Sequence, residues 1–358
     1  MIYTIESLLT NPGTIKAVID RLEVQATEAD KIQWKDYLTP KQANPDGTFK
    51  TFVGTQTAVI VGSIIDRYSN KPIRKRHPLA TGFGEVAALG EAYQMDNARL
   101  EQLQILIDTY NQRGERAVAE EIVAFLVDDM RQCYLAPHKR MDLMLADLKY
   151  TGKATSHSNV DMDGVKIEEI TLPITKLTPA AAYKDKFISY LANQVEQLRA
   201  KGKDISVLEM SRATFAQYIV GCAEFKDTFV SKFGSFEFKS GGLATPAMAN
   251  ELFTALQIPV TIKIKQEYIS KQDGVSANVV PDGKIAMLPN EKLGNLRWKK
   301  PYELTDHIPQ KTYSERENGL FIATQRTEEG RFVEYGCEWI VEIDKPNRMA
   351  LMDLKNLQ

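Results

Sequence analysis

Residues 95–148 read MDNARLEQLQILIDTYNQRGERAVAEEIVAFLVDDMRQCYLAPHKRMDLMLADL, and this stretch decides the fold class. Its apolar residues recur every three or four positions, at Leu100, Leu103, Ile107, Val118, Ile122, Leu126, Met130, Met141, Leu145 and Leu148. This spacing places each set on one face of a helix. We expect Gly114 and Pro137 to bend or break the helix, because both residues are poor helix formers. The stretch therefore predicts a long helical spine that lies against a sheet or against other subunits.

The residues before this spine predict a long two-stranded hairpin. Residues 48–68, TFKTFVGTQTAVIVGSIIDRY, are rich in Thr, Val and Ile, which favour strands. Residues 69–78, SNKPIRKRHP, form a basic, turn-like run, and residues 78–95 return as a second extended segment. We expect the basic run to be a flexible tip. Residues 1–45 predict an extended arm with two short helices, interrupted by prolines.

The hairpin tip carries the densest basic patch of the chain, formed by Lys71, Arg74, Lys75 and Arg76. Three interpretations are open: a solvated loop, a salt-bridging contact with an acidic strip on a neighbouring copy, and a contact with nucleic-acid phosphates. Aromatic residues that could stack on bases do not interleave with these cations. We rank the solvated loop first, the contact between subunits second and the nucleic-acid contact third.

After residue 164 the sequence alternates between short strands and helices, which predicts an α+β fold. Strands are expected at 164–174, 205–210, 260–265, 284–289, 320–325, 338–343 and 349–354, and a helix at 180–201. Ser211 is placed to cap a helix over RATFAQYIVGC. Thr245 followed by Pro246 predicts the start of another helix, PAMANELFTAL.

Composition excludes several classes of protein. The 358 residues are 43% hydrophobic and 26% charged, the balance of a soluble chain with a substantial core. Lys and Arg number 45 against 47 Asp and Glu, so a dedicated nucleic-acid binder is disfavoured. The three cysteines lack CxxC spacing, which argues against a disulfide framework and a structural zinc site. We expect neither a transmembrane helix nor a secretory signal, because the sequence has no apolar run of the required length.

The sequence assigns no catalytic, cofactor-binding or metal-binding residue. The nucleotide-binding P-loop, the GxSxG and HExxH motifs and the protein-kinase signatures are all absent. A calcium loop beginning at Asp161 would need a glutamate at its twelfth position, where Leu172 stands. An α+β enzyme with a dispersed site stays an alternative, with His157, Asp161 and Asp163 as its candidate residues.

Three further stretches carry a resemblance to a known family. They are KGKDISVLEMSRATFAQY (201–218), VVPDGKIAMLPNEKLGNLRW (279–298) and DKPNRMALMDLKN (344–356). Together with the order of the predicted parts, they resemble the major capsid proteins of tailed bacteriophages, which have the HK97-type fold and include the lambda-like capsid protein group.

The resemblance implies an HK97-like capsid fold divided into five segments. These are an N-terminal arm at 1–47, an extended β-hairpin loop at 48–92, and the spine helix with the peripheral domain at 93–179. An axial domain follows at 180–330, and a C-terminal segment at 331–358 returns to the peripheral domain.

The function implied by the resemblance is structural, with no catalysis and no cofactor. Such a chain self-assembles as hexamers and pentamers into an icosahedral phage head that encloses double-stranded DNA without sequence-specific binding. We expect it in the virion capsid, assembled in the host bacterial cytoplasm, with separate scaffolding, portal and decoration proteins as partners and no membrane. An encapsulin-like nanocompartment shell is the alternative within the same fold.

Overall fold

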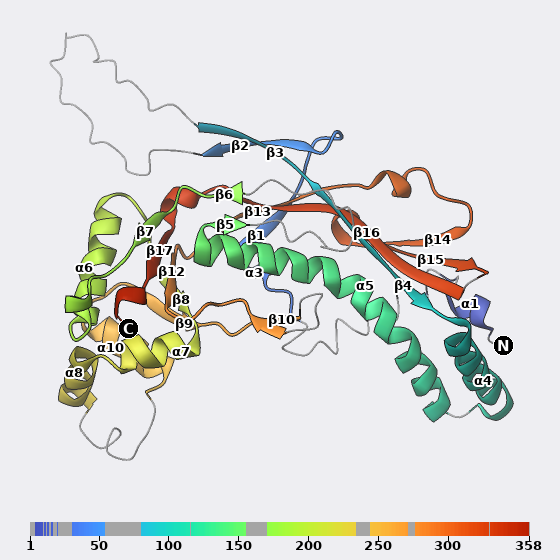
Figure 1. The fold of residues 1–358 in the computed structure, drawn as a ribbon, viewed down its shortest axis with the longest axis horizontal. Coiled ribbons are helices and arrows are strands. Elements are labelled where there is room, and N and C mark those ends of the chain that lie inside the picture. The colour runs from blue at the N-terminus through green and yellow to red at the C-terminus, as the bar shows by residue number, and fades with distance from the viewer. Residues whose placement is uncertain are drawn as a thin grey trace, which may run out of the picture. The chain divides into compact units, whose positions relative to one another are not determined.

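The computed structural model describes residues 4–9, 11, 13, 16, 20, 31–53, 80–114, 116–154, 170–233, 244–270, 276–328 and 330–357 (Figure 1). The chain forms two compact units, each built from several separate segments. Unit 1 comprises Met1–Phe49, Phe83–Asp142 and Asn295–Glu342, and unit 2 comprises Lys50–Gly82, Leu143–Gly294 and Ile343–Gln358. These units do not correspond one to one with the five segments expected from the sequence, and the boundaries of those segments stay a prediction.

The core of unit 1 is a six-stranded sheet organised around one long strand (Figure 1). In sheet order its strands are β1 (Leu38–Gln42), β13 (Gly294–Lys299), β16 (Gly330–Ile343), β15 (Phe321–Thr327) and β14 (Lys311–Glu315), and β4 (Ala87–Met95) also pairs with β16. Both β4 and β15 run antiparallel to β16. The predicted strand at 338–343 is therefore the second half of a strand of 14 residues.

The two faces of β16 differ, as the period of two in a strand dictates. Val333, Tyr335, Cys337 and Trp339 are buried on one face, which packs on α5 (Arg116–Thr151). Glutamates at every fourth position of the other face pair with cations of β13 and β14, in the ion pairs Lys311–Glu334, Lys299–Glu338 and Arg297–Glu342. Apolar packing therefore holds one face of the sheet, and ion pairs across the strands hold the other.

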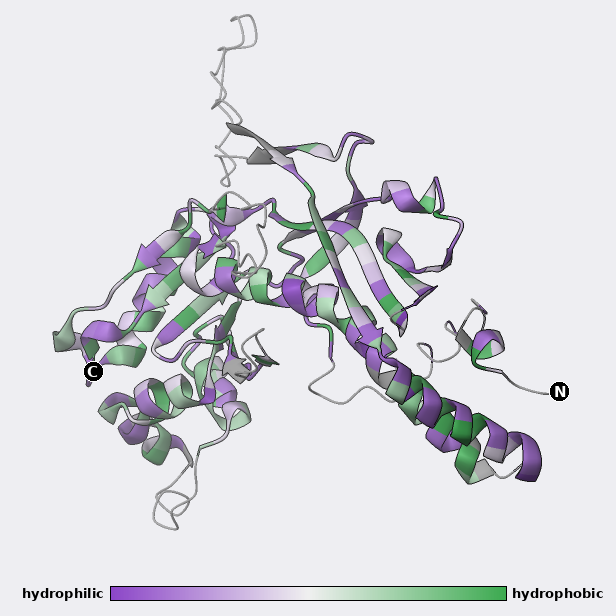
Figure 2. Cartoon of the chain, turned by 45° about the vertical axis from the view of Figure 1, so that its right-hand side comes forward, coloured by the Kyte–Doolittle hydropathy of each residue, from purple (hydrophilic) through white to green (hydrophobic). Residues whose placement is uncertain are grey.

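Two helices, α4 (Asn97–Arg113) and α5, occupy the stretch predicted to be the spine. Asp96 caps α4 by accepting a hydrogen bond from the N–H of Arg99 at 2.8 Å. Gly114 ends the helix with a left-handed φ of 63°, and its N–H donates to the carbonyl of Tyr110. The predicted break at Gly114 is thus confirmed. Figure 2 shows hydrophobic and hydrophilic bands following one another along both helices, as expected where apolar residues recur every three or four positions.

The break expected at Pro137 does not occur, because α5 continues through this residue. An interior proline costs about 3 kcal/mol, since it removes one backbone hydrogen bond and crowds the preceding turn. Tyr134, His138 and Met141 lie around it at helical spacing and are all buried. Their packing offsets the local cost and keeps the helix intact.

Unit 2 is built on a five-stranded mixed sheet. In sheet order its strands are β7 (Thr175–Leu177), β17 (Ala350–Asp353), β12 (Lys284–Leu288), β8 (Val207–Met210) and β9 (Thr261–Ile264). The central β12 runs antiparallel to β17 and β8, while β7 and β9 pair parallel with their neighbours. The helices are α6 (Phe187–Ala200), α7 (Arg212–Thr214), the π-helix η2 (Phe215–Val220), α8 (Ala223–Phe233) and α10 (Pro246–Ala255). Their apolar residues form one core with the sheet.

Both helix caps predicted in unit 2 are confirmed. The hydroxyl of Ser211 accepts a hydrogen bond from the N–H of Thr214 at 3.1 Å, and that of Thr245 accepts from Met248 at 3.3 Å. Two details differ from the prediction. The segment after Ser211 is a short α-helical turn followed by a π-helix, and the helix expected from residue 180 begins at Phe187, after a 3₁₀ turn.

The predicted hairpin is represented by a two-stranded sheet of β2 (Thr48–Val53) and β3 (Ala80–Glu85). Val86 separates β3 from β4, so the second half of the expected return strand belongs to the large sheet of unit 1. Residues 54–79, which include the predicted basic tip, lie outside the described residues.

The remaining described elements are short. They are α1 (Ile5–Leu9), α3 (Trp34–Tyr37), β5 (Lys153–Ala154), β6 (Ile170–Thr171), β10 (Tyr268–Ser270), β11 (Ser276–Asn278), η1 (Ala181–Tyr183), η3 (Tyr302–Leu304), η4 (Glu317–Gly319), η5 (Pro346–Arg348) and η6 (Lys355–Leu357). Of the strand predicted at 164–174, the described part holds only β6.

Candidate functional site

The residues singled out from the sequence fall outside the described part of the chain. This applies to the four basic residues of the hairpin tip, Lys71, Arg74, Lys75 and Arg76, and to the enzyme candidates His157, Asp161 and Asp163. Within the described ranges, three or more His, Cys, Asp or Glu residues nowhere form a group that could hold a metal ion. No helix of this part is long and apolar enough to cross a membrane. Two clusters of unit 1, where extended segments join the core, form the candidate site.

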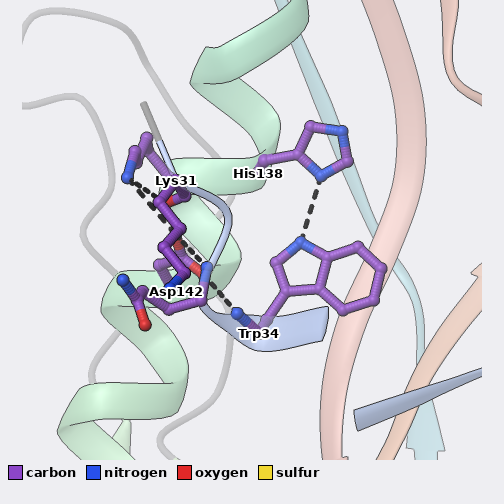
Figure 3. Close-up of polar contacts among 6 residues, drawn as sticks. Lys31, Trp34, His138 and Asp142 are labelled. Atoms are coloured by element: carbon purple, nitrogen blue, oxygen red, sulfur yellow. Dashed lines mark hydrogen bonds and ion pairs between the residues drawn. The ribbon is translucent and has the colours of Figure 1, made fainter. Parts of the chain in front are cut away.

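The first cluster fastens residues 31–35 of the expected N-terminal arm, and Asp142 is its centre (Figure 3). Its carboxylate accepts hydrogen bonds from the backbone N–H groups of Trp34 at 2.7 Å and Gln33 at 3.2 Å. These bonds satisfy donors at the start of α3, which lacks a capping side chain of its own. Lys139 lies 3.6 Å from the same carboxylate and donates to the carbonyl of Lys31 at 2.7 Å. Burial raises the pKa of Asp142, although these donors act in the opposite direction.

The indole of Trp34 completes this cluster. Its Nε1–H donates to Nδ1 of His138 at 3.0 Å, and the two rings stack with their centroids 5.7 Å apart (Figure 3). Trp339 of β16 packs against both rings. Because Nδ1 accepts, the neutral imidazole carries its proton on Nε2, which has no hydrogen-bond partner among the residues that the structure describes. Burial, aided by nearby Lys35 and Lys139, lowers the pKa of His138 to about 3, so the ring is neutral near pH 7.

The same cluster extends to the turn η4. Trp339 Nε1–H donates to the carbonyl of Asn318 at 2.8 Å, and Lys35 forms an ion pair with Glu317. Asn318 has a left-handed φ of 57°, a conformation that asparagine tolerates better than most residues. Residues 34 and 35 are therefore held by α5, β16 and η4 at once.

The second cluster holds the base of the two-stranded sheet. The ring of Phe49 lies against Gly84, where an added Cβ would come within 2.5 Å of the ring. The guanidinium of Arg297 lies 5.1 Å from the centroid of the same ring. Arg297 in turn forms a buried ion pair with Glu342, at 2.6 Å, and Asn295 donates to that carboxylate at 2.8 Å. The base of the loop is thus fixed to β13 and β16.

A tight turn precedes this sheet. The carboxylate of Asp46 accepts a hydrogen bond from the backbone N–H of Thr48 at 2.9 Å, and this hydrogen bond lowers the pKa of Asp46. Gly47 has a left-handed φ of 86°, and its carbonyl accepts from the N–H of Val86 at 3.0 Å. The turn therefore ties the start of β2 to the end of β3.

The chemistry of both clusters is that of anchors. Burial raises the pKa of the Cys133 and Cys337 thiols, so both thiols are neutral near pH 7. His138 is equally shielded. The two clusters fix the positions of backbone segments: the first holds residues 34 and 35, and the second holds the base of the β2–β3 sheet.

Sequence reasoning missed both clusters. A signal for the first exists, because His138 and Asp142 are four residues apart and therefore share one face of the predicted helix. Trp34, a large apolar residue in a polar arm, is a second signal, because an isolated segment could not bury it. The pairing of Phe49 with Gly84 has no comparable signal.

Comparisons with known proteins show which solved structures are similar to this architecture. A scan against family models finds no match, and no similar sequence is found among curated proteins. Among solved structures, one described as a capsid protein of a prophage of E. coli CFT073 superposes with a TM-score of 0.56 over 96% of this chain and 99% of that one, at 10% identity. The chain has the HK97-type capsid fold.

A phage-related protein of Bordetella bronchiseptica RB50 is also similar, with a TM-score of 0.49, 7% identity, and coverage of 98% of this chain and 99% of that one. The first cluster joins α3 to α5 and β16, and the second lies at β2 and β3.

Proposed function

We propose that this chain is a major capsid protein of a tailed phage or prophage, which self-assembles as hexamers and pentamers into an icosahedral head enclosing double-stranded DNA. The observation that carries the proposal is the HK97-type fold, matched over 96% of the chain. The role is structural and non-enzymatic, and the chain belongs in the virion capsid after assembly in the host cytoplasm.

The two anchored segments support a role in assembly. In the described residues β2 and β3 pair only with each other. A two-stranded sheet is marginally stable alone in water, and its open edges invite further pairing. Neighbouring subunits in a shell would cover such edges and supply the missing apolar contacts. The rigid base at Phe49 and Gly84 then sets the direction in which the loop reaches its neighbour.

The basic residues of the loop fit the same account. We propose that Lys71, Arg74, Lys75 and Arg76 contact acidic groups of a neighbouring subunit. The formal net charge of −2 suits a shell that encloses DNA without gripping it, because a strongly basic lining would bind the genome. Scaffolding, portal and decoration proteins are the expected partners.

The contents of the particle test the proposal against its alternative within the fold, an encapsulin-like nanocompartment. Particles would be purified from cells that carry the complete gene cluster, treated with nuclease and then extracted. We expect nuclease-protected double-stranded DNA. Particles that hold a co-purifying enzyme and no DNA would assign the chain to a nanocompartment.

A further inference from the structure

Arg331, in the first half of β16, is a buried cation whose side chain has no partner among the described residues. Its side chain is 5% exposed, yet it forms no hydrogen bond or ion pair with any described residue, and its Nε is fully enclosed. Buried charges are ordinarily paired, because an isolated one loses its hydration without compensation. The enclosed Nε therefore calls for an anion that the described residues do not supply.

A second arginine lies next to it. In the antiparallel register Arg326 of β15 stands directly opposite Arg331, so both side chains project from the same face of the sheet. Like charges in this position repel each other, and together with burial Arg326 lowers the pKa of Arg331. Two opposed cations are destabilising as they stand and become favourable once an anion bridges them.

Helix α4 begins directly after β4, the strand that pairs with β16 (Figure 1). Arg331 is also opposite Met95, the last residue of β4, and Arg326 Nη1 lies 3.5 Å from Oδ1 of Asn97, the first residue of α4. The N-terminal end of a helix of 17 residues adds positive potential.

The acidic groups nearby do not neutralise the pair. Asp96 accepts from the N–H of Arg99, and Asp129 pairs with the Arg99 guanidinium at 3.5 Å. Glu6 of α1 favours the charged form of Arg331 electrostatically, but no ion pair joins the two residues.

We propose that Arg331 and Arg326, at the start of α4, form a binding site for a small oxyanion of the phosphate class. The planar guanidinium matches two oxygens of such an anion in one plane. Arg331 is only 5% exposed. A small free ion can reach such a side chain, whereas the phosphates in the backbone of duplex DNA cannot approach it as closely. This site is independent of the assembly proposed above.

Isothermal titration of the purified chain with inorganic phosphate, at constant ionic strength, tests the site. We expect saturable binding at one ion per chain. Arg331→Met and Arg326→Met should each raise the Kd by roughly tenfold or more, because each removes charge-assisted hydrogen bonds. Arg348→Met, which changes an arginine paired with Glu291 in unit 2, is the matched control and should leave the Kd unchanged.

Thermal unfolding separates loss of the site from loss of the fold. Without phosphate, Arg331→Met should unfold at the same temperature as wild type or higher, because it removes an uncompensated buried charge and keeps an apolar stem. Phosphate should raise the midpoint of wild type and leave that of Arg331→Met unchanged. The proposal is overturned if wild type shows no saturable binding or if Arg331→Met binds as tightly. Binding of a short DNA duplex through these arginines, without a response to inorganic phosphate, would equally overturn it.

Discussion

Protonation of His138 is opposed by its burial and by its neighbours. Protonation of Nδ1 would remove the acceptor used by the Trp34 indole and place a charge among three aromatic rings, those of Trp34, Tyr134 and Trp339. The neighbouring cations Lys35 and Lys139 oppose that charge further. The first cluster, called the arm anchor from here on, therefore depends on a neutral imidazole.

This dependence predicts acid sensitivity with a definite sign. Below pH 6.5 the unfolded chain protonates this histidine, whereas the folded chain does so only near pH 3, so stability falls as the pH is lowered between these values. Each pH unit in this window costs up to about 1.4 kcal/mol. His138→Gln keeps an acceptor for the indole but does not titrate, so it should lose roughly 2 kcal/mol less than wild type between pH 7 and pH 5. Urea unfolding at both pH values measures the difference, and equal losses in the two proteins would contradict the neutral-histidine account.

Gly84 is fixed by its contact with a ring. A Cβ at this position would approach the Phe49 ring to 2.5 Å, so Gly84→Ala should lower the free energy of unfolding by about 1–3 kcal/mol through overpacking. Phe49→Ala removes the obstacle. In that background the same glycine substitution should cost less than about 0.5 kcal/mol. The four proteins form a double-mutant cycle in urea unfolding, and additive costs would show that the ring does not fix this glycine.

At the scale of elements, the sequence predicts the helix ends that are set by hydrogen bonds between residues close together in the chain. The caps at Ser211 and Thr245 and the end of α4 at Gly114 depend on groups within four residues of one another. The unbroken helix at Pro137 depends instead on burial against elements far away in the chain. The arm anchor joins residues 104 to 109 positions apart, which no local pattern encodes.

The full length of β16 was not predicted, because it too depends on contacts between residues far apart in the chain. Its first half carries Arg331 and Glu334 among apolar residues, so it lacks the uniform apolar character of a buried strand. Glu334 is accommodated by an ion pair with Lys311 of β14, and such pairing is invisible until the strand order is known. The α+β class and the spine were predictable because they rest on periodicity alone.

The extended loop is the element on which assembly should depend. Replacing residues 54–79 by a short Gly-Ser linker leaves β2, β3 and the Phe49 contact in place, so we expect a folded chain with an unchanged circular dichroism spectrum. Closed shells should be abolished, because the contacts that the loop makes with a neighbour are gone. Changing Lys71, Arg74, Lys75 and Arg76 together to Gln isolates the part due to charge. Shells of normal size from the linker variant, seen by electron microscopy, would refute the role given to the loop.

At the scale of the whole molecule, the fold provides a core that is stable by itself and segments that are not. Unit 2 buries a continuous apolar core around its sheet, and unit 1 does so between α5 and β16. The two-stranded sheet of β2 and β3 has no such core of its own among the described residues. The open edges of such a sheet favour pairing with a further chain, as the proposed assembly requires.

The most direct test of this account is negative-stain electron microscopy of the purified full-length chain, with size-exclusion chromatography of the same sample. We expect closed shells, or rings of five or six subunits, eluting far ahead of a 40.3 kDa monomer. A monodisperse monomer or dimer at every concentration, with no ring or shell on the grid, would contradict the claim that this chain builds a capsid.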